Sequence, residues 1–279
     1  MASLDFTKMH GLGNDFIIID GIGKKISSRP WSKLTVQLCD RFTGVGGDGV
    51  ILALPSRRAD ARMRIFNSDG SESEMCGNGL RCMIRLIYDR GYLKTRQCSI
   101  ETMKRNIAAQ IVFASKKNFL VRYCVGEPEF VADRIPMNVN QEYFINGKIK
   151  INRKNYVVTS LSVGNPHTVV FVDDLSFDWR TIGAEIEVHP MFPNRTNVEF
   201  AMPATKSRIL LKSWERGAGP THASGTGACA AVAAGVMVGL LKREVEVVCD
   251  LGSLIVEWPQ SDGSIYQTGS ADYSFTGIA

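Results

Sequence analysis

Two small residues with a nucleophilic side chain occupy the same kind of sequence context, far apart in the chain. Cys76 is followed by Gly-Asn-Gly at 77–79 and Ser224 by Gly-Thr-Gly at 225–227, and a run with helical spacing follows each motif. A residue directly before a helix lies near exposed backbone N–H groups and the positive end of the helix dipole, which both favour negative charge. For a cysteine this position lowers the thiol pKa, so Cys76 is a candidate base or nucleophile.

The backbone N–H groups at these two helix starts can also hold an anion such as a carboxylate. They belong to Gly77, Asn78, Gly79, Gly225, Thr226 and Gly227. If both starts converge on one carboxylate, residues 76 and 224 lie on opposite faces of the adjoining carbon. One residue then removes the α-proton and the other returns a proton from the opposite side. Binding the carboxylate also stabilises the carbanion-like transition state, so the sequence predicts a two-base racemase that needs no cofactor.

The sequence around the two motifs is an internal repeat. A strand at 63–67 and a polar loop lead to the first motif and a helix at 80–88, while a strand at 209–216 and a glycine loop lead to the second motif and a helix at 228–241. Coincidence is the alternative, because Gly-x-Gly often precedes a helix. The matching order of elements favours two similar domains, with the active site in the cleft between them.

The remaining pattern indicates a mixed α/β protein of the α+β class with mainly antiparallel sheet. Strands are expected at 6–9 and 16–20 around a turn, a helix at 31–41, a glycine-rich loop at 44–49 and a strand at 50–54. Short strands alternate with turns at 98–125 and 143–173. We place an N-terminal domain with Cys76 at 1–125 and 270–279, and a C-terminal domain with Ser224 at 126–269.

Composition excludes several other classes of protein. The net charge of +5 is spread along the chain, and basic clusters lack interleaved aromatic residues, so no nucleic-acid partner is expected. No apolar run is long enough to span a bilayer, and the first residues lack a signal-peptide pattern. Seven cysteines without a regular framework fit a reduced, cytoplasmic protein. Paired zinc-ligand spacing, the Rossmann glycines and a Walker lysine motif are all missing, so neither a metal nor a cofactor is expected.

Seven ordered motifs resemble those of the diaminopimelate epimerases, and the resemblance runs along nearly the whole chain. They are His-Gly-Leu-Gly-Asn-Asp-Phe at 10–16, Phe-Asn-Ser-Asp-Gly-Ser at 66–71, Glu-Met-Cys-Gly-Asn-Gly at 74–79, Gly-Asn-Pro-His at 164–167, Arg-Thr-Asn at 195–197, Trp-Glu-Arg-Gly-Ala-Gly at 214–219 and Ser-Gly-Thr-Gly-Ala at 224–228. Chance similarity across so many motifs in the same order is very improbable.

The resemblance implies a cofactor-independent interconversion of LL- and meso-2,6-diaminopimelate, in lysine and peptidoglycan biosynthesis. It makes Cys76 one of the acid/base pair and places His167 and Glu215 near that pair. The implied substrate-binding residues are Asn14, Asn67, Asn165, Asn197, Glu215 and Arg216. Arg216 can bind a carboxylate through two hydrogen bonds, Glu215 can meet an ammonium, and the amides can bind both. The family fold is a pseudo-symmetric pair of domains, each a curled sheet around a central helix, and the family assembles as a homodimer.

One departure from the family pattern concerns the chemistry itself, because the second catalytic cysteine of the family falls at Ser224. A serine hydroxyl is a far weaker acid than a thiol, so proton transfer at this position should be impaired. Either the serine is a deliberate substitution, made to trap substrate or prevent a disulfide with Cys76, or the chain is a natural divergent relative. Two other functions therefore stay open: a racemase of another amino acid, such as histidine or proline, and a non-catalytic amino-acid-binding protein.

Single residues also have plainer interpretations. Cys76 could be a buried structural thiol, although its polar neighbours indicate exposure. Asn14 could serve only a turn, Asn165 could only end a strand, and Arg216 could be an ordinary surface charge. Three further cysteines in helix or strand patterns are expected in the core, and these are Cys82, Cys229 and Cys249.

Overall fold

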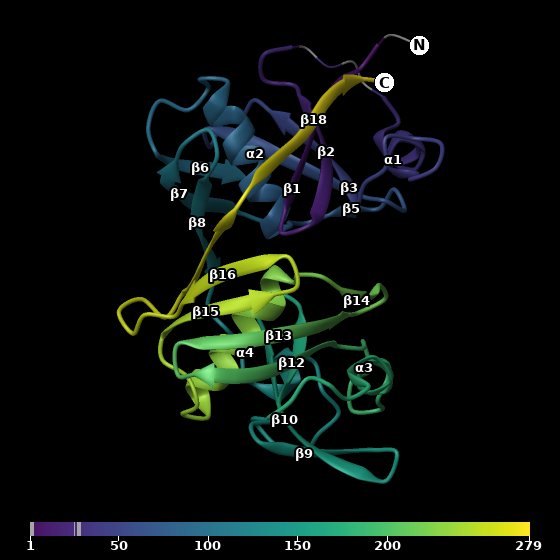
Figure 1. Cartoon of the computed structure of the whole chain (residues 1–279), viewed down its shortest axis with the longest axis vertical. Helices are drawn as coiled ribbons and strands as arrows, with labels where there is room; N and C mark the ends of the chain where they lie inside the picture. The colour runs from purple at the N-terminus through teal and green to yellow at the C-terminus, as the bar shows by residue number, and fades with distance from the viewer. Residues whose placement is uncertain (1–2, 25, 27–28) are drawn as a thin grey trace. The chain divides into compact units, whose positions relative to one another are not determined.

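A computed structural model describes residues 3–24, 26 and 29–279, and the chain divides into two compact units (Figure 1). Unit 1 comprises Met1–Tyr123 and Thr268–Ala279, and unit 2 comprises Cys124–Gln267. The chain passes from unit 1 to unit 2 within strand β8 (Phe119–Gly126) and returns within strand β17 (Ile265–Ser270). Each unit is a mixed α/β assembly of many strands and two α-helices.

Unit 1 is built on a sheet that begins with the N-terminal hairpin. Its elements are β1 (Asp5–Gly11), β2 (Asn14–Asp20), α1 (Trp31–Cys39), β3 (Gly49–Leu54), β4 (Ala61–Asn67), β5 (Glu72–Ser73), α2 (Gly77–Asp89), β6 (Gln97–Glu101), β7 (Asn106–Ala114), the first part of β8, and β18 (Asp272–Ile278). The pairs β2–β3 and β4–β6 are parallel, and β1–β2, β3–β4 and β6–β7 are antiparallel. The last strand, β18, returns to pair with β1.

Unit 2 repeats this plan. Its elements are the 3-10 helix η1 (Ala132–Arg134), β9 (Gly147–Ile151), β10 (Lys154–Ser162), β11 (Pro166–Phe171), α3 (Trp179–Glu187), β12 (Asn197–Thr205), β13 (Arg208–Glu215), β14 (Gly219–Thr221), α4 (Gly225–Met237), β15 (Glu244–Cys249), β16 (Gly252–Glu257) and the first part of β17. Here β11–β12 and β13–β15 are parallel, while β10–β11, β12–β13 and β15–β16 are antiparallel.

The two units therefore share one order of elements and one set of strand pairings. The run from β1 to β7 with α1 and α2 corresponds, element for element, to the run from β10 to β16 with α3 and α4. Parallel and antiparallel pairs fall at equivalent places in both runs. The predicted internal repeat is confirmed, and it extends over more elements than the strand, loop and helix seen in the sequence.

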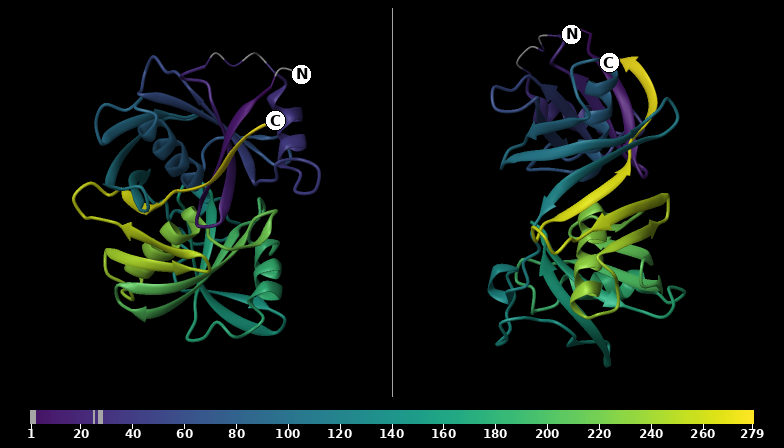
Figure 2. Two further views of the ribbon diagram at one scale, coloured as in Figure 1. Left: turned by 45° about the horizontal axis from the view of Figure 1, so that its top comes forward. Right: turned by 90° about the vertical axis from the view of Figure 1, so that its left-hand side faces the viewer.

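Strands of its own unit surround each of the two motif-bearing helices. Helix α2 packs against β1, β2, β3 and β4, and α4 packs against β10, β11, β12 and β16 (Figure 2). Residues 227–235 of α4 are all buried, as its small residues predict, because alanine and glycine let strands approach closely. Cys82, Cys229 and Cys249 are buried as expected. None of the helices among the described residues is long and apolar enough to cross a membrane.

Helix α2 buries the side chains of Arg81 and Arg85, and both donate to backbone carbonyls of the returning C-terminal segment. The Arg81 guanidinium donates to the Ser270 carbonyl at 2.9 Å, and that of Arg85 donates to the Ala271 carbonyl at 2.5 Å. A buried guanidinium is tolerated only when its donors find acceptors. The returning C-terminal segment thus fixes the helix that begins at Cys76.

The ends of the motif-bearing helices differ from the prediction. Both helices begin at the glycine motif itself, at Gly77 and Gly225, three residues earlier than expected. Helix α4 ends at Met237, so the helix predicted to 241 was too long at this end. Gly239 adopts φ +76°, and the Leu240 N–H donates to the Gly235 carbonyl at 2.9 Å. This left-handed glycine ends the helix in the manner of a Schellman turn.

Helix α3, which was not predicted from the sequence, covers one face of the unit 2 sheet. Asp178 caps α3 by accepting a hydrogen bond from the Thr181 N–H. Its buried residues Trp179 and Ile186 pack with Val198 and Phe200 of β12. The Phe200 ring makes an edge contact with Phe177 at 5.5 Å between centroids. The core on this face therefore centres on β12, whose opposite face carries side chains toward α4.

We expect Phe200→Ala to lower the free energy of unfolding by about 3–5 kcal/mol, because it removes a large ring from a closed apolar cluster. Phe200 is 0% exposed, and the matched control Phe42→Ala removes a ring that is 96% exposed. The control should shift stability by no more than about 0.5 kcal/mol. Urea denaturation and hydrogen exchange of unit 2 amides would measure the difference. Equal stability of the two variants would contradict the core position of Phe200.

Candidate functional site

Cys76 is the N-cap residue of helix α2. Its backbone is extended, with φ −138° and ψ 123°, and its side chain makes no capping hydrogen bond to the first turn. The thiol is half-buried, and its Sγ donates to the Asn14 Oδ1 at 3.6 Å. The N–H groups at the start of α2 therefore keep their capacity to bind an anion, as the sequence predicts for this position.

A chain of polar contacts fixes Asn14 beside Cys76. The Asn14 Nδ2 donates to Asp48 Oδ2 at 2.6 Å, and its Oδ1 accepts from Asn78 Nδ2 at 3.1 Å. Arg41 in turn donates to Asp48 Oδ1 at 2.8 Å. The glycine-rich loop at 44–49 thus has a role that the sequence analysis missed, because its Asp48 holds the Asn14 carbonyl oxygen toward the thiol.

Asn78 and Asn67 have different surroundings. The Asn78 side chain is 4% exposed, accepts from Arg81 at 2.7 Å and donates to Asn14, so its amide supports Asn14. Asn67 is exposed at the end of β4 and donates to Ser71 Oγ at 3.1 Å. In the sheet register Asn67 lies opposite Gly49, which lies opposite Phe16. Asn67 therefore belongs to the same sheet end as Asn14.

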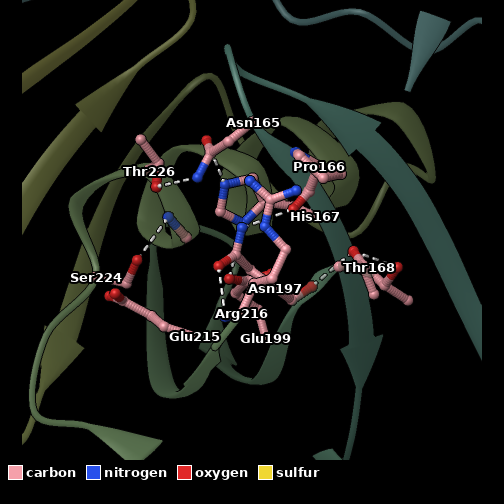
Figure 3. A network of polar contacts seen from close by, with 12 residues as sticks. Asn165, Pro166, His167, Thr168, Asn197, Glu199, Glu215, Arg216, Ser224 and Thr226 are labelled. Carbon is pink, nitrogen blue, oxygen red and sulfur yellow. Dashed lines mark hydrogen bonds and ion pairs between the residues drawn. The ribbon is translucent and has the colours of Figure 1, made fainter. Parts of the chain in front are cut away.

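Ser224 is the N-cap residue of α4 in unit 2, and its side chain accepts a capping hydrogen bond. Its Oγ accepts from the Gly227 N–H at 3.2 Å, and the residue is 3% exposed. The hydroxyl also hydrogen-bonds to the Glu215 carboxyl group. Ser224 is thus held between a carboxyl group and a helix N–H (Figure 3), whereas Cys76 makes no contact of the capping kind.

Glu215 ends β13 and has an altered acidity. Burial raises the pKa of its carboxyl group above the ordinary value, and the nearby Glu199 charge adds to this rise. Hydrogen bonds from Ser224 and Thr221 and the charge of His167 act in the opposite direction but do not outweigh burial. The Thr221 Oγ1 donates to Glu215 Oε1 at 3.2 Å. The raised pKa makes this carboxyl group easier to protonate than an ordinary glutamate, so Glu215 is a candidate for proton exchange.

His167 is fully buried between two acceptors at the start of β11. Its Nδ1 lies 2.8 Å from Glu199 Oε1 and its Nε2 lies 2.9 Å from Asn165 Oδ1. The Asn165 Nδ2 then reaches Thr226 Oγ1 in the first turn of α4, at 3.5 Å. Figure 3 shows these residues grouped at the N-terminus of α4. Glu199 was not predicted as a site residue, although a carboxylate inside an otherwise apolar strand is a usable signal.

Asn197 and Arg216 lie together, but the Asn197 amide serves the main chain. Its Nδ2 donates to the Pro166 carbonyl at 2.7 Å and its Oδ1 accepts from the Arg216 N–H at 3.0 Å. Asn197 is 6% exposed, and its two hydrogen bonds connect β11 with the segment after β13. The Arg216 side chain is exposed and donates to the Asn194 carbonyl at 3.0 Å.

Glu187, at the end of α3, anchors the same segment and was not identified from sequence. Its Oε2 accepts from Trp214 Nε1 at 2.7 Å, and its Oε1 accepts from the Gly217 N–H at 2.9 Å. Burial alone would raise the Glu187 pKa, but the hydrogen bonds from Trp214, Gly217 and Arg195 outweigh it and lower the pKa. Glu187 therefore fixes the residues on both sides of Glu215 and Arg216.

We expect Glu187→Gln to lower the free energy of unfolding at pH 7 by about 1–3 kcal/mol, because it weakens bonds from buried donors. A folded-state pKa below the unfolded value of about 4.3 stabilises the fold above that pH, and the gain is lost as pH falls through the folded value. The difference from the parent should therefore shrink below about pH 4. Denaturant titrations at several pH values, with the exposed Asp133→Asn as control, measure it. A difference independent of pH would contradict this assignment.

The candidate residues thus form one group in each unit. Unit 1 brings together Asn14, Cys76 and the Asn78 side chain, with Asn67 at the same sheet end. The unit 2 group consists of Asn165, His167, Asn197, Glu215, Arg216, Ser224 and Thr226. In the part of the chain that the structure describes, no cluster of three His, Cys, Asp or Glu side chains could hold a metal ion. Each group combines a helix start with an amide and a residue able to exchange a proton.

Several solved structures share this fold. A phenazine biosynthesis protein of the PhzF family from Bacillus anthracis aligns with a TM-score of 0.72 at 17% identity, covering 100% of this chain and 99% of the other. A hydroxyproline epimerase from Agrobacterium vitis aligns with a TM-score of 0.72 at 15% identity, covering 99% and 92%. At this level of identity the similarity establishes the two-unit fold and nothing further.

Sequence relatives are far closer. The diaminopimelate epimerase of Desulfitobacterium hafniense is 44% identical over 277 residues, which cover 99% of this chain and 98% of the relative. That of Pelotomaculum thermopropionicum is 44% identical over 275 residues, covering 98% of each. The family model for diaminopimelate epimerase matches residues 6–131 and 159–274. The resemblance seen in the seven motifs is confirmed, and the chain belongs to the diaminopimelate epimerase family.

Proposed function

We propose that this chain is an isomerase that interconverts LL- and meso-2,6-diaminopimelate without a cofactor, in lysine and peptidoglycan biosynthesis. The observation that carries the proposal is the repeated placement of a small nucleophilic residue as the N-cap of a buried central helix. Relatives that align over almost the whole chain are named diaminopimelate epimerases. In this proposal Cys76 and Ser224 serve opposite faces of the substrate α-carbon.

Cys76 is the residue best suited to remove or return the α-proton. Its thiol donates to the Asn14 carbonyl oxygen, which orients the S–H group, and the start of α2 favours the thiolate. A substrate carboxylate at the N–H groups of Gly77 and Asn78 would bring the α-carbon within reach of Sγ. The same N–H groups would stabilise the negative charge that spreads into the carboxylate during proton transfer.

Ser224 is the weak member of the pair. Its hydroxyl lies between Glu215 and the Gly227 N–H, an arrangement that fixes its direction but does not make it a strong acid. A serine alkoxide is scarcely populated at neutral pH, so proton transfer on this face should be slow. We therefore propose an enzyme whose inversion is limited at Ser224, while exchange on the Cys76 face is retained.

The remaining residues would hold the substrate. Arg216 is exposed next to Glu215, and a guanidinium binds carboxylate through two parallel hydrogen bonds. Asn67 and Asn165 each have an amide able to bind the amino or carboxylate group, and Glu215 can meet an ammonium. Gly225 and Thr226 would bind the carboxylate through their N–H groups in the way of Gly77 and Asn78. His167 supports this group through Asn165.

We also propose that the chain works as a cytoplasmic homodimer. Strand β18 carries two exposed large apolar side chains, Phe275 at 51% and Ile278 at 71%, which a second chain could cover. Light scattering should give the mass of two chains, and Ile278→Lys should give the mass of one. A dimer that persists in Ile278→Lys would locate the interface elsewhere, and a monomeric parent would overturn the proposal.

Deuterium exchange tests the catalytic proposal. Incubated in D₂O, diaminopimelate should gain deuterium at one α-carbon, and mass spectrometry and NMR would locate it. If diaminopimelate gains no deuterium but histidine or proline does, the chain is a racemase of another amino acid. Binding of diaminopimelate without exchange in any variant would identify a binding protein instead.

A further inference from the structure

Glu199 is a buried carboxylate that the proposed chemistry does not use. It lies on β12 with Asn197 on one face, while Val198 and Phe200 on the other face join the core with α3. A Cβ atom added at Gly227 would lie 2.7 Å from Glu199 Oε1. The carboxylate therefore packs directly against the first turn of α4, and Gly227 leaves the room that it needs.

Burying this carboxylate costs free energy that an apolar residue would avoid. Glu199 is 0% exposed, and its Oε1 lies 2.8 Å from His167 Nδ1. Within the described residues, Oε2 is buried with no hydrogen-bond partner. A well-packed hydrophobic residue is usually at least as stable as a buried ion pair. A group retained at this cost indicates a role in the neighbouring site.

The contacts of Glu199 continue in one direction, to the start of α4. His167 Nδ1 lies 2.8 Å from Glu199 Oε1, and its Nε2 lies 2.9 Å from Asn165 Oδ1. Because a carboxylate oxygen and an amide oxygen can only accept, this arrangement requires a proton on each ring nitrogen. The Asn165 oxygen is thereby occupied, so its NH₂ group faces Thr226 Oγ1 at 3.5 Å (Figure 3). A ring that donates from both nitrogens is an imidazolium, and the Glu199 charge beside it compensates the positive charge.

We propose that Glu199 is a positioning residue, which acts through His167 to hold the Asn165 amide with its NH₂ group toward the first turn of α4. There the amide adds one donor to the backbone N–H groups that bind a carboxylate. The opposite orientation of the amide would place its oxygen against the anion and repel it. That the anion is a substrate carboxylate rests on the proposed function. The hydrogen-bonded arrangement of Glu199, His167 and Asn165 does not depend on that function.

Side-chain NMR tests the order of the three residues independently of activity. Long-range ¹⁵N–¹H correlation distinguishes an imidazolium from each neutral tautomer, and His167→Gln assigns the signal among the four histidines. At pH 7 the parent should show protons on both nitrogens of His167, and Glu199→Gln should show one. Glu246→Gln, which changes a half-exposed carboxylate on β15, should leave the signal unchanged. A neutral ring in the parent, or an unchanged ring in Glu199→Gln, would overturn the proposal.

Ligand affinity tests the consequence. Glu199→Gln should raise the KM for diaminopimelate about tenfold with a smaller change in kcat, as expected for a lost charge-assisted hydrogen bond, and Glu199→Asp should recover part of the affinity. If Glu199→Gln does not fold, Asn165→Asp decides. It still accepts from His167 but presents an oxygen to the anion, so KM should rise at least as much. Unchanged affinity in Asn165→Asp overturns the role of the amide. If no variant turns over diaminopimelate, the proposed function fails, and the NMR result still judges Glu199.

Discussion

Replacing Ser224 by cysteine should raise the rate of diaminopimelate epimerisation by about 10²- to 10⁴-fold, the usual contribution of one general acid or base. A thiol has an ordinary pKa of about 8.5, and the start of a helix lowers it further, so both thiol and thiolate are accessible at neutral pH. The residue already lies at the N-cap of α4, beside Glu215 and the Gly227 N–H. A cysteine therefore enters a position where the helix start favours the thiolate.

The measurement is full inversion, followed by the loss of α-hydrogen and the appearance of the other epimer. Ser224→Ala is the control, because it removes the hydroxyl without adding a thiol and should epimerise no faster than the parent. The assay needs a reductant, since a second thiol could form a disulfide with Cys76. If Ser224→Cys is as slow as Ser224→Ala, residue 224 does not transfer the proton, and a binding or regulatory role becomes the better explanation.

The fold was accessible from sequence where local signals were strong. The Gly-x-Gly motifs predicted that a helix follows Cys76 and Ser224, although each helix begins three residues earlier than expected, because such starts are set by neighbouring residues. The end of α4 was wrong, because the apolar run continues to Leu241 while the left-handed Gly239 stops the helix. Helix α3 was missed, although Asp178 gives a capping signal, because it is short and lies between two strand-rich regions.

The candidate site was accessible only in part, because its supporting contacts join residues distant in sequence. Their position at a helix start was enough to predict four candidate site residues, which are Cys76, Asn78, Ser224 and Thr226. No local pattern reveals that Glu199 meets His167, that Asp48 holds Asn14, or that Glu187 anchors Gly217. These carboxylates are found only once the strands are placed in register.

Asn197 shows what the hydrogen bonds add to a role assigned by resemblance. The resemblance gives this residue to the substrate, and in the structure its amide contacts the Pro166 carbonyl and the Arg216 N–H. These bonds fix the start of the segment that carries Arg216, and direct contact of Asn197 with the substrate stays a prediction.

Cys76→Ser should abolish the exchange that the parent retains on one face of the substrate, a fall of about 10²- to 10⁴-fold. Because position 224 is already a serine, this variant has a hydroxyl at both helix starts, and neither alkoxide is populated enough to act as a base. The contact to Asn14 should survive, since a serine hydroxyl also donates to the amide oxygen. The loss then reports the acidity of the residue at 76 and not its position.

Deuterium uptake from D₂O, measured separately from the LL and meso epimers, identifies the face that fails. Exchange without inversion is the expected behaviour of the parent, since Cys76 can remove and return a proton on its own side. Cys124→Ser changes another half-buried cysteine and should leave the exchange intact. Full exchange in Cys76→Ser would remove Cys76 from the mechanism, whereas loss in both variants would indicate a general effect on folding. If exchange is lost in Cys76→Ser but not in Cys124→Ser, and epimerisation is faster in Ser224→Cys, proton transfer depends on the residues at both helix starts.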